Sequence, residues 1–502
     1  MTSNQLPETS NMKHKIILVL DCGATNVRTI AVSEKGEILA SKSLPNTTQP
    51  DPENKNYRIW DVNEIWNKFR TTTGKVLEKI ESKDIAGITV TAFGVDGAPY
   101  NKSGNMLYPV ISWQCQRTEP IMQNIGKYIS LEHLYSINGI QPFNFNTINK
   151  LIWLKENRPA IIDKMDNFIF IPSIFLYFLT GEIVSDSSMA GTSMLTDLRK
   201  RSFSPEILNS IGISDNIFPK MVEPGSVIGK VTHQASIETG IPAGIPVVAA
   251  GHDTQFAIFG SGAAENTPVL SSGTWEILMV RTSNIDTSGE VLKSGVTTEF
   301  DPLPGLYNMG VQWIASGALE WLRKMFFAKE IDSEDIYEIM INEARNTKVG
   351  SNGIMVDASF YPEPGGADSG FIRNLTMETS RGDIYRAALE SLSCKTRERL
   401  EQLQETGKFK ADSLICVGGG SKNILWNQIR ADVLGIPVKL IDQKETTVLG
   451  AALFAMSGVN IFSTPDQARE SIDFTGDIYE PSLDAMAYTD IYEQYLELKN
   501  PK

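Results

Sequence analysis

The feature that most constrains the fold is an apolar run near the N-terminus that an acid and a tight turn interrupt. Residues 18–32 read LVLDCGATNVRTIAV. The apolar letters on both sides of DCGATN are rich in the residues that strands favour, and glycine with asparagine is typical of a turn. A polar turn at 33–36 and a further apolar piece, EILA, follow. Residues 16–46 are therefore predicted to begin a β-hairpin arrangement and not a βαβ unit.

The DCGATN turn has two readings. In the first, Asp21 is only an Asx-type acid that stabilises a hairpin turn. In the second, Gly23 lets the backbone approach phosphate oxygens, Thr25 and Asn26 donate hydrogen bonds to them, and Arg28 offsets their charge. Asp21 would then reach a hydrated Mg²⁺. The stretch lacks the Lys-Ser/Thr ending of a Walker A motif, which excludes a P-loop.

Length and charge limit the classes of protein. A chain of 502 residues is long enough for two large α/β domains. The net charge of −14 argues against nucleic acid or an anionic membrane as a partner. The N-terminus has no apolar signal core, and the longest apolar stretch, 168–179, is too short to span a bilayer. A cytoplasmic protein is expected.

Metal and disulfide frameworks are not indicated by the cysteines and histidines. The chain has four of each, and the cysteines are far apart, which fits neither a zinc spacing nor a set of disulfides. Cys22 and Cys416 adjoin apolar runs and are read as small core residues.

Two acids follow apolar runs in positions where ligands commonly bind. Asp96 follows the apolar residues from 85 onward and has Gly97 after it, while Asp253 follows the apolar run from 244 and the pair Gly251-His252. An acid at such a strand end can accept a proton from a substrate hydroxyl. The alternatives are a cap for Asp96 and a buried acid satisfied by backbone donors for Asp253.

A glycine-rich unit lies near the C-terminus. Residues 413–441 read as a buried strand, the triple glycine 418–420, a helix closed by Gly435, and another strand. Backbone N–H groups at such a helix start favour phosphate, although a plain tight turn explains the glycines equally well. It is not a dinucleotide fingerprint, because Asn423 stands where the third glycine is required.

The order of the pieces indicates two domains. Residues 244–281 are predicted to be strand-like, and they repeat the opening pattern of an apolar strand, an acid beside glycine, and a turn. Thr274 lies in the turn SSGT of this repeat, where it could be a plain turn residue. Residues 260–267, GSGAAENT, are the predicted linker. Further helices are expected over 128–180, up to Gly407 and in TTVLGAALFAMSG. This constellation suits a nucleotide held between two domains.

The motifs, taken in order, resemble those of the FGGY carbohydrate kinases. They are DCGATNVR, FGVDGA, LTG with the serine-rich loop after it, GHDTQFA, SSGTWE and VGGGSKNILWNQIRAD. The resemblance implies a two-domain actin-like and hexokinase-like ATPase fold of the α/β class (ribonuclease H-like), with an interdomain active-site cleft. Its predicted parts are a polar extension (1–14), the N-terminal kinase domain (15–260), the C-terminal kinase domain (261–462) and a tail (463–502).

The resemblance also implies ATP-dependent phosphorylation of a small ketose, L-fuculose at its C1 hydroxyl, in L-fucose catabolism. L-rhamnulose, D-ribulose and D-xylulose are alternative substrates, and an ATP-binding protein without sugar turnover on the same fold is a more remote one. Mg²⁺ with ATP is the implied cofactor. Whether the chain forms a homo-oligomer is left open.

Roles follow by position from the resemblance. Asp253 is implied as the general base and Asp21 as a ligand of Mg²⁺ through water. The implied sugar-binding residues are Asp96, Gly97, His252 and Thr254. The implied ATP-binding residues are Gly23, Ala24, Thr25, Asn26, Arg28, Thr274, Gly419, Gly420 and Asn423. The chain departs from the Trp-x-Asp-x-Arg pattern of many members, because Cys115 replaces the acid. Residues 352–374 match the family poorly.

Overall fold

A computed structural model describes residues 15–358, 369–443 and 445–499 of the chain. The predicted polar extension and the middle of 352–374 lie outside these residues. The chain forms two compact units. Unit 1 comprises 1–129, 142–260 and 447–473, and unit 2 comprises 130–141, 261–446 and 474–502. The chain thus enters unit 2 briefly at 130–141, passes to it again after Gly260, and returns to unit 1 over 447–473, so the predicted tail is shared between the two units.

Unit 1 is built on a six-stranded sheet with the order β14-β15-β6-β1-β2-β3. Its strands are β1 (Ile16–Cys22), β2 (Asn26–Ser33), β3 (Ile38–Pro45), β6 (Ile85–Ala92), β14 (Val227–Lys230) and β15 (Pro246–Val248). The pairs β1–β2 and β2–β3 are antiparallel, whereas β1–β6 and β6–β15 are parallel. The predicted meander at 16–46 is confirmed, and β1 is buried along its whole length.

Unit 2 repeats this arrangement in a seven-stranded sheet with the order β18-β19-β17-β16-β22-β23-β24. Its strands are β16 (Val269–Ser272), β17 (Trp275–Thr282), β18 (Thr297–Phe300), β19 (Tyr307–Ile314), β22 (Leu414–Val417), β23 (Val438–Leu440) and β24 (Ile478–Tyr479). The hairpin β16–β17 is antiparallel, and β16–β22 and β22–β23 are parallel. The tight hairpin beside a parallel strand is therefore common to both sheets.

The predicted internal repeat is present, but the strand-like reading of 244–281 is wrong in its middle. Residues Asp253–Gly260 form helix α10, so Asp253 begins a helix instead of ending a strand. Its apolar sequence, QFAIF, is too short for its spacing to separate a buried helix from a buried strand. The hairpin that corresponds to the first meander is β16–β17, with the Gly273-Thr274 turn between its strands.

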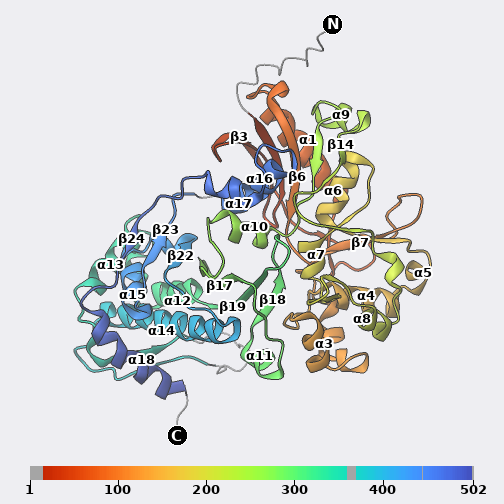
Figure 1. The fold of residues 1–502 in the computed structure, drawn as a ribbon. Helices are drawn as coiled ribbons and strands as arrows, with labels where there is room; N and C mark the ends of the chain where they lie inside the picture. Colours follow the sequence, from red (N-terminus) through yellow and green to blue (C-terminus); the bar gives the residue numbers. More distant parts are fainter. Residues whose placement is uncertain (1–14, 359–368, 444, 500–502) are drawn as a thin grey trace. The chain divides into compact units, whose positions relative to one another are not determined.

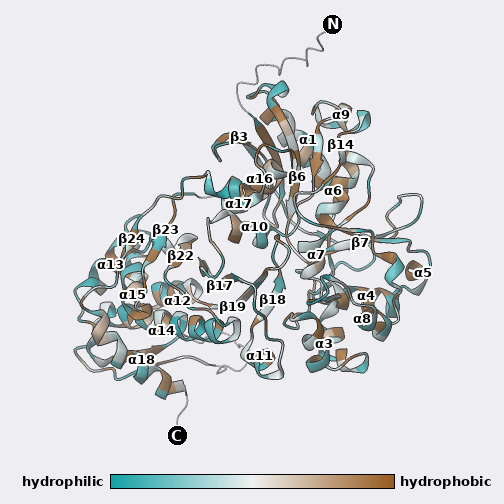
Figure 2. Cartoon of the chain, in the orientation of Figure 1, coloured by the Kyte–Doolittle hydropathy of each residue, from teal (hydrophilic) through white to brown (hydrophobic). Residues whose placement is uncertain are grey.

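The helices of unit 1 include those predicted within 128–180 and in TTVLGAALFAMSG, together with several that were not predicted. They are α1 (Val62–Leu77), α2 (Glu119–Gln123), α4 (Thr147–Asn157), α5 (Pro159–Ile162), α6 (Ile171–Thr180), α7 (Ser187–Gly191), α8 (Pro205–Ile211), α9 (His233–Thr239), α10, α16 (Thr446–Gly458) and α17 (Pro465–Glu470). Helix α4 ends before Pro159, as predicted. The expected helical stretch 128–180 also contains a short strand, β9 (Asn167–Phe170), which pairs with β7 (Gly97–Tyr100). Helix α6, brown in Figure 2, is largely buried.

The helices of unit 2 are α3 (Leu131–Asn138), α11 (Gly289–Ser294), α12 (Ser316–Phe326), α13 (Ile336–Arg345), α14 (Arg381–Gly407), α15 (Ile424–Leu434) and α18 (Ala485–Lys499). The predicted end of α14 at Gly407 is confirmed, and Ser380 with Asp383 forms a capping box at its start. Such reciprocal bonds satisfy N–H groups that the first turn leaves unpaired.

Short sheets complete the two units. They are β4 (Gln49–Pro50), β5 (Arg58–Trp60) and β8 (Val110–Ile111) in one sheet, and the pairs β7–β9, β10 (Ser185–Asp186) with β13 (Met221–Val222), β11 (Thr196–Asp197) with β12 (Ser202–Phe203), and β20 (Met355–Asp357) with β21 (Phe371–Arg373).

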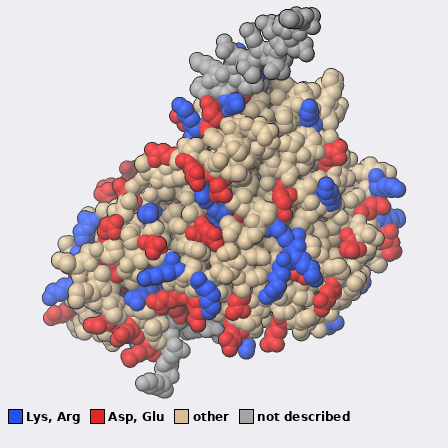
Figure 3. All heavy atoms as spheres, in the orientation of Figure 1, with Lys and Arg blue, Asp and Glu red and all other residues tan. Residues whose placement is uncertain are grey.

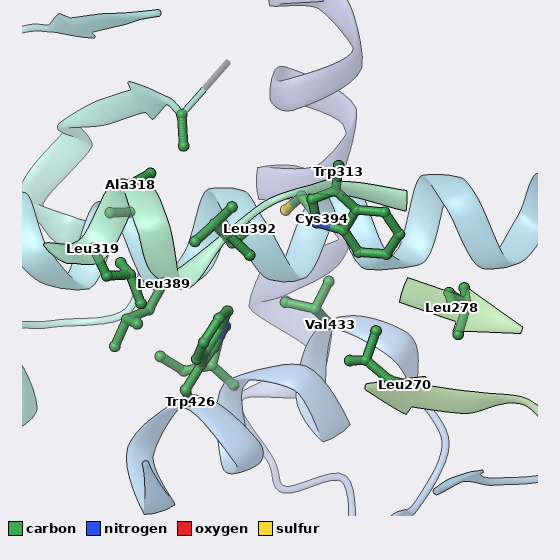
Figure 4. Close-up of a cluster of buried hydrophobic side chains, with 14 of the residues drawn as sticks. Leu270, Leu278, Trp313, Ala318, Leu319, Leu389, Leu392, Cys394, Trp426 and Val433 are labelled. Atoms are coloured by element: carbon green, nitrogen blue, oxygen red, sulfur yellow. The ribbon is translucent and has the colours of Figure 1, made fainter. Parts of the chain in front are cut away.

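The core of unit 2 lies between its sheet and the helices α12, α14 and α15 (Figure 4). The cluster includes Leu270 and Leu278 from the sheet and Leu389 and Leu392 from α14, and Trp426 of α15 is 1% exposed. Removing a buried tryptophan side chain typically costs about 3–5 kcal/mol of stability. Trp426 matters for the site as well, since it lines a cavity described below.

The surface is mixed in charge. On the face drawn in Figure 3, Lys and Arg are interspersed with Asp and Glu. Over the described residues, no helix combines the length and the apolar character needed to cross a bilayer.

Candidate functional site

In unit 1, three segments from distant parts of the sequence end side by side. Cys22 at the end of β1 pairs with Ala92 at the end of β6. Ala92 in turn forms a parallel bridge with His252, and its N–H donates to the carbonyl of Gly251 at 3.0 Å. The carboxyl ends of parallel strands meet at one sheet edge, which is where ligands commonly bind. The edge therefore brings together Asp21 and the His252-Asp253 pair.

Asp253 is the most exposed acid of this edge, and its side chain is 30% accessible. Its Oδ1 accepts hydrogen bonds from the N–H and the hydroxyl of Thr254, at 2.6 and 3.3 Å. The Nε2 of His252 lies 3.5 Å from the same oxygen. Burial among protein atoms raises the pKa of Asp253 to about 6, and the Thr254 hydrogen bonds only partly oppose this shift. A carboxylate with such a pKa is suited to accept a proton near neutral pH.

Asp21 and Arg28 form an ion pair across the β1–β2 hairpin. The Oδ2 of Asp21 accepts from Nε and Nη2 of Arg28 at 2.8 and 2.5 Å. The two residues are directly opposite in the strand register. Arg28, predicted to offset phosphate charge, is thus already partnered by the acid, and its role toward phosphate stays a prediction.

The turn between β1 and β2 presents polar groups to the outside. Gly23 donates its N–H to the carbonyl of Asn26 at 2.8 Å, and Asn46 fixes the turn from the side by a bond to the Gly23 carbonyl at 2.9 Å. Thr25 and Asn26 are exposed, and Ala24 is half-buried. The turn therefore has a fixed backbone and accessible donors, which is what a phosphate-binding loop requires.

Asp96 is fully buried, at 0% exposure. Its Oδ1 pairs with Nζ of Lys150, and its Oδ2 accepts from Trp60 Nε1 at 2.7 Å and from the N–H of Trp113 at 3.0 Å. Burial raises the pKa of Asp96 and lowers that of Lys150, while their contact opposes both shifts. The direct contact of Asp96 with a sugar stays a prediction, because it requires this shell to rearrange.

The loop before Asp96 is strained. Val95 has φ of 64°, a conformation that β-branched residues rarely adopt. Its carbonyl accepts from Thr147 Oγ1 at 2.8 Å and from Lys150 Nζ at 3.0 Å, so α4 stabilises the strained loop. The sequence reading missed Lys150, because nothing in NKLIWLKEN separates it from Lys155. Gly97 is buried beside β9, where a Cβ would lie 2.7 Å from the Ile169 carbonyl.

Cys115 is part of a buried network and not an open position. Its Sγ accepts from Arg117 Nε at 3.1 Å and from the N–H of Arg58 at 3.3 Å. Arg117 also pairs with Asp51 at 2.9 Å and lies over the ring of Tyr57. Cys115 is 1% exposed, so in this structure its thiol serves as a buried acceptor for Arg117 and does not reach the surface.

Unit 2 contains a cavity of about 480 Å³. Its lining includes four of the predicted ATP-binding residues, Thr274, Gly419, Gly420 and Asn423, and also Gly273, which precedes Thr274. The other walls are mostly apolar and aromatic, from Leu319, Met340, Ile341, Tyr337, Tyr385 and Trp426, with Ser316, Glu320 and Lys422 as polar groups. Its size and its mixture of flat apolar walls with a few polar groups suit a small organic ligand such as a nucleoside.

The glycine turn and Asn423 form one side of this cavity. Gly418 has φ of 91°, which explains why glycine is needed there. Asn423 caps α15 by accepting from the N–H of Trp426 at 3.1 Å and donates to Tyr385 Oη at 3.2 Å. The predicted strand, turn and helix over 413–434 are confirmed.

A buried arginine that the sequence reading missed connects the two loops of the cavity. Arg430 is 0% exposed, pairs with Glu276 and donates to Ser272 Oγ at 2.8 Å. Its guanidinium lies 3.6 Å from the ring centroid of Trp426. Ser272 and Glu276 flank the Gly273-Thr274 turn, so Arg430 ties that turn to α15. Removing one partner of such a buried pair typically costs about 3–5 kcal/mol.

The crowding around Ser272 leads to a testable difference between two adjacent glycines. A Cβ on Gly420 would lie 2.1 Å from Ser272 Oγ, whereas one on Gly419 would meet nothing within 4 Å. We expect Gly420→Ala to lower the free energy of unfolding by about 1–3 kcal/mol, because Ser272 is fixed by its bonds to Arg430 and Glu276. Gly419→Ala is the matched control and should change it by less than about 0.5 kcal/mol. Chemical denaturation of both variants is the measurement, and equal effects would contradict this packing.

Comparison with known proteins agrees with this geometry. Residues 16–260 match the N-terminal domain model of the FGGY family of carbohydrate kinases, and residues 269–459 match its C-terminal domain model. The chain is 46% identical over 473 residues to the L-fuculokinase of Escherichia coli (strain K12), covering 94% of this chain and 98% of that one. It is 29% identical to a rhamnulokinase of Bacteroides thetaiotaomicron, covering 88% and 90%.

Among solved structures, xylulose kinase from Rhodospirillum rubrum has the same fold, with a TM-score of 0.88 at 22% identity over 96% of this chain and 98% of that one. The two domain models together span most of the chain. This protein therefore belongs to the FGGY family of carbohydrate kinases and has the two-domain α/β fold of that family.

Proposed function

We propose that this enzyme transfers the terminal phosphoryl group of ATP to the C1 hydroxyl of L-fuculose, giving L-fuculose 1-phosphate in the breakdown of L-fucose. The observation that carries the proposal is the 46% identity to an L-fuculokinase over 98% of that enzyme. L-rhamnulose is the second candidate substrate, supported by the lower 29% identity to a rhamnulokinase. Both are small ketoses, and both reactions use the same phosphoryl-transfer chemistry.

Asp253 is proposed as the general base. It takes the proton of the attacking hydroxyl, since its carboxylate is accessible and its pKa of about 6 leaves it mostly ionised at neutral pH. His252 and Thr254, which lie against Asp253, are proposed to bind sugar hydroxyls together with Gly97 and Asp96. Asp96 would do so only if its contacts with Trp60 and Trp113 opened.

ATP is assigned to polar groups on each unit separately. In unit 2, the adenosine portion is assigned to the cavity beside Gly419, Gly420 and Asn423, and Thr274, which also lines this cavity, is assigned to the phosphates. In unit 1, the turn Gly23–Asn26 offers exposed donors to phosphate oxygens. Cytoplasmic location follows from the use of ATP and is part of the proposal.

Mg²⁺ is the metal that this chemistry implies. Among the described residues, no three His, Cys, Asp or Glu side chains are grouped so that they could hold a metal ion. Mg²⁺ is commonly bound by one or two carboxylates, waters and the phosphates of the substrate, so its binding does not depend on such a group. Asp21, oriented by Arg28, is the residue that would hold it through water. When bound, the ion neutralises charge on the phosphates.

The sugar assignment is tested by ADP release with a panel of ketoses. We expect L-fuculose to give a kcat/KM at least about tenfold above that of L-rhamnulose, D-ribulose and D-xylulose, because sites that pair substrate hydroxyls discriminate strongly. A higher value for another ketose would overturn the L-fuculose assignment and leave the kinase family intact. ADP release that no sugar increases would support the remote alternative, an ATP-binding protein without sugar turnover.

The base is tested by Asp253→Asn. The amide cannot accept the proton, so kcat should fall by about 10²–10⁴-fold while the protein still folds. Asp163→Asn, at an exposed acid of the same unit, is the control and should keep wild-type turnover. Activity of Asp253→Asn close to that of the control would show that another group is the base.

A further inference from the structure

The peptide group between Gly251 and His252, one residue before Asp253, is hydrogen-bonded on both of its sides. The carbonyl of Gly251 accepts from the N–H of Ala92 and from Thr91 Oγ1, both at 3.0 Å. The N–H of the same peptide, that of His252, donates to Ser188 Oγ at 3.0 Å. Strand β6 therefore fixes one side of this peptide and Ser188 fixes the other.

Ser188 is itself oriented by a buried acid. Its hydroxyl donates to Asp186 Oδ1 at 2.5 Å, which leaves a lone pair of Oγ for the His252 N–H. The same Oδ1 accepts from the N–H groups of Ser188 and Met189, at 2.8 and 3.2 Å, and so caps helix α7. Asp186 and Ser188 are both 0% exposed, so neither can touch a substrate in this structure.

The fit between these residues and the loop is too close for any side chain at position 251. A Cβ on Gly251 would lie 2.1 Å from Asp186 Oδ1 and 2.5 Å from Ser188 Oγ. On the other side of the loop, a Cβ on Gly94 would lie 2.6 Å from Nε2 of His252. Glycine at 251 therefore allows the acid and the hydroxyl to approach the backbone just before Asp253.

A helix cap alone does not require a carboxylate in this position. Burial, together with a smaller contribution from the nearby Glu223, raises the pKa of Asp186 to about 6, so ionised Asp186 is costly here. An asparagine or serine would cap the short helix without that cost. Beyond the cap, Asp186 accepts a hydrogen bond from the Ser188 hydroxyl, and this hydroxyl in turn accepts one from the N–H of His252.

We propose that Asp186 and Ser188 are positioning residues for the phosphoryl-transfer reaction: they fix the Gly251–His252 peptide and thereby the direction in which the start of α10 presents Asp253. The inference rests on the proposed function for its kinetic consequence. Its structural consequence, a rigid loop at 251–253, does not depend on which substrate the enzyme uses.

Ser188→Ala removes the acceptor of the His252 N–H and leaves the rest of the contact in place. A displacement of about 1 Å at a reacting group can cost about 10²-fold in rate. We expect kcat to fall at least about tenfold, while KM for ATP stays within about twofold because the proposed adenosine cavity is formed by residues of unit 2. Ser188→Thr keeps a hydroxyl at this position, so its kcat should be higher than that of Ser188→Ala.

Ser193→Ala is the matched control. Ser193 is also 0% exposed, and its hydroxyl bonds remain local, to the carbonyl of Ala190 at 2.6 Å and from the N–H of Leu195 at 3.2 Å. The kcat of both variants is measured at a temperature well below the midpoint of their thermal unfolding, so that lost stability alone does not lower kcat. The control should keep kcat within about twofold.

Hydrogen exchange of peptides covering 246–258, without substrates, is the second readout. Ser188→Ala should speed exchange in this segment relative to Ser193→Ala, because the His252 amide loses its acceptor. If Ser188→Ala has the same kcat and the same exchange rates over 246–258 as Ser193→Ala, the proposed positioning role of Ser188 is wrong. Faster exchange in an enzyme that phosphorylates no ketose would refute the proposed function and leave the structural part of the inference standing.

Asp186→Asn covers the case in which Ser188→Ala does not fold. It keeps an acceptor oxygen for the Ser188 hydroxyl but removes the charge, so we expect a smaller loss of kcat than tenfold and a smaller rise in exchange over 246–258. No change in either quantity would overturn the role of Asp186.

Discussion

The site in unit 1 depends on the parallel pairing of β1 with β6 and on the bridge from β6 to His252. These pairings bring the ends of three segments, near residues 22, 92 and 252, to one sheet edge. No single segment carries both of the acids Asp21 and Asp253. Together they place an ion-paired acid at the end of β1 next to a second acid at the start of α10, whose environment raises its pKa to about 6.

Buried charged pairs keep the loops of both units in fixed conformations. Lys150 reaches from α4 to Asp96 and to the strained Val95 carbonyl, and Arg430 reaches from α15 to Glu276 beside the Gly273-Thr274 turn. Buried pairs of this kind add little net stability, because desolvation offsets most of their attraction. Their effect here is to fix one loop conformation, which a site that acts by positioning groups requires.

Much of the fold could be predicted from local patterns. The β1–β2 hairpin, the end of α4 before Pro159 and the strand–glycine–helix unit at 413–434 are marked by turn residues, caps and apolar spacing that act within a few residues. Helix α10 was misread because its apolar run is short. In such runs the spacing alone does not distinguish helix from strand.

The residues that support the site could not be predicted in the same way. Lys150, Ser188 and Arg430 each bond a partner more than 50 residues away, at Asp96, His252 and Glu276. No local pattern in a single sequence encodes such a partner. The acids at the loops were recognisable because glycine and apolar runs flank them, whereas their supporting side chains lie inside ordinary helices and loops.

The pH dependence of kcat/KM for L-fuculose, measured at saturating ATP from about pH 5 to about pH 8, tests the central claim most directly. The ionised form of Asp253 accepts the proton, and its pKa of about 6 means that this form is lost as the pH falls through that value. The account predicts a rate that declines about tenfold per pH unit below about pH 6 and is steady above it. A rate that stays constant down to about pH 5 would contradict the assignment of Asp253 as the base.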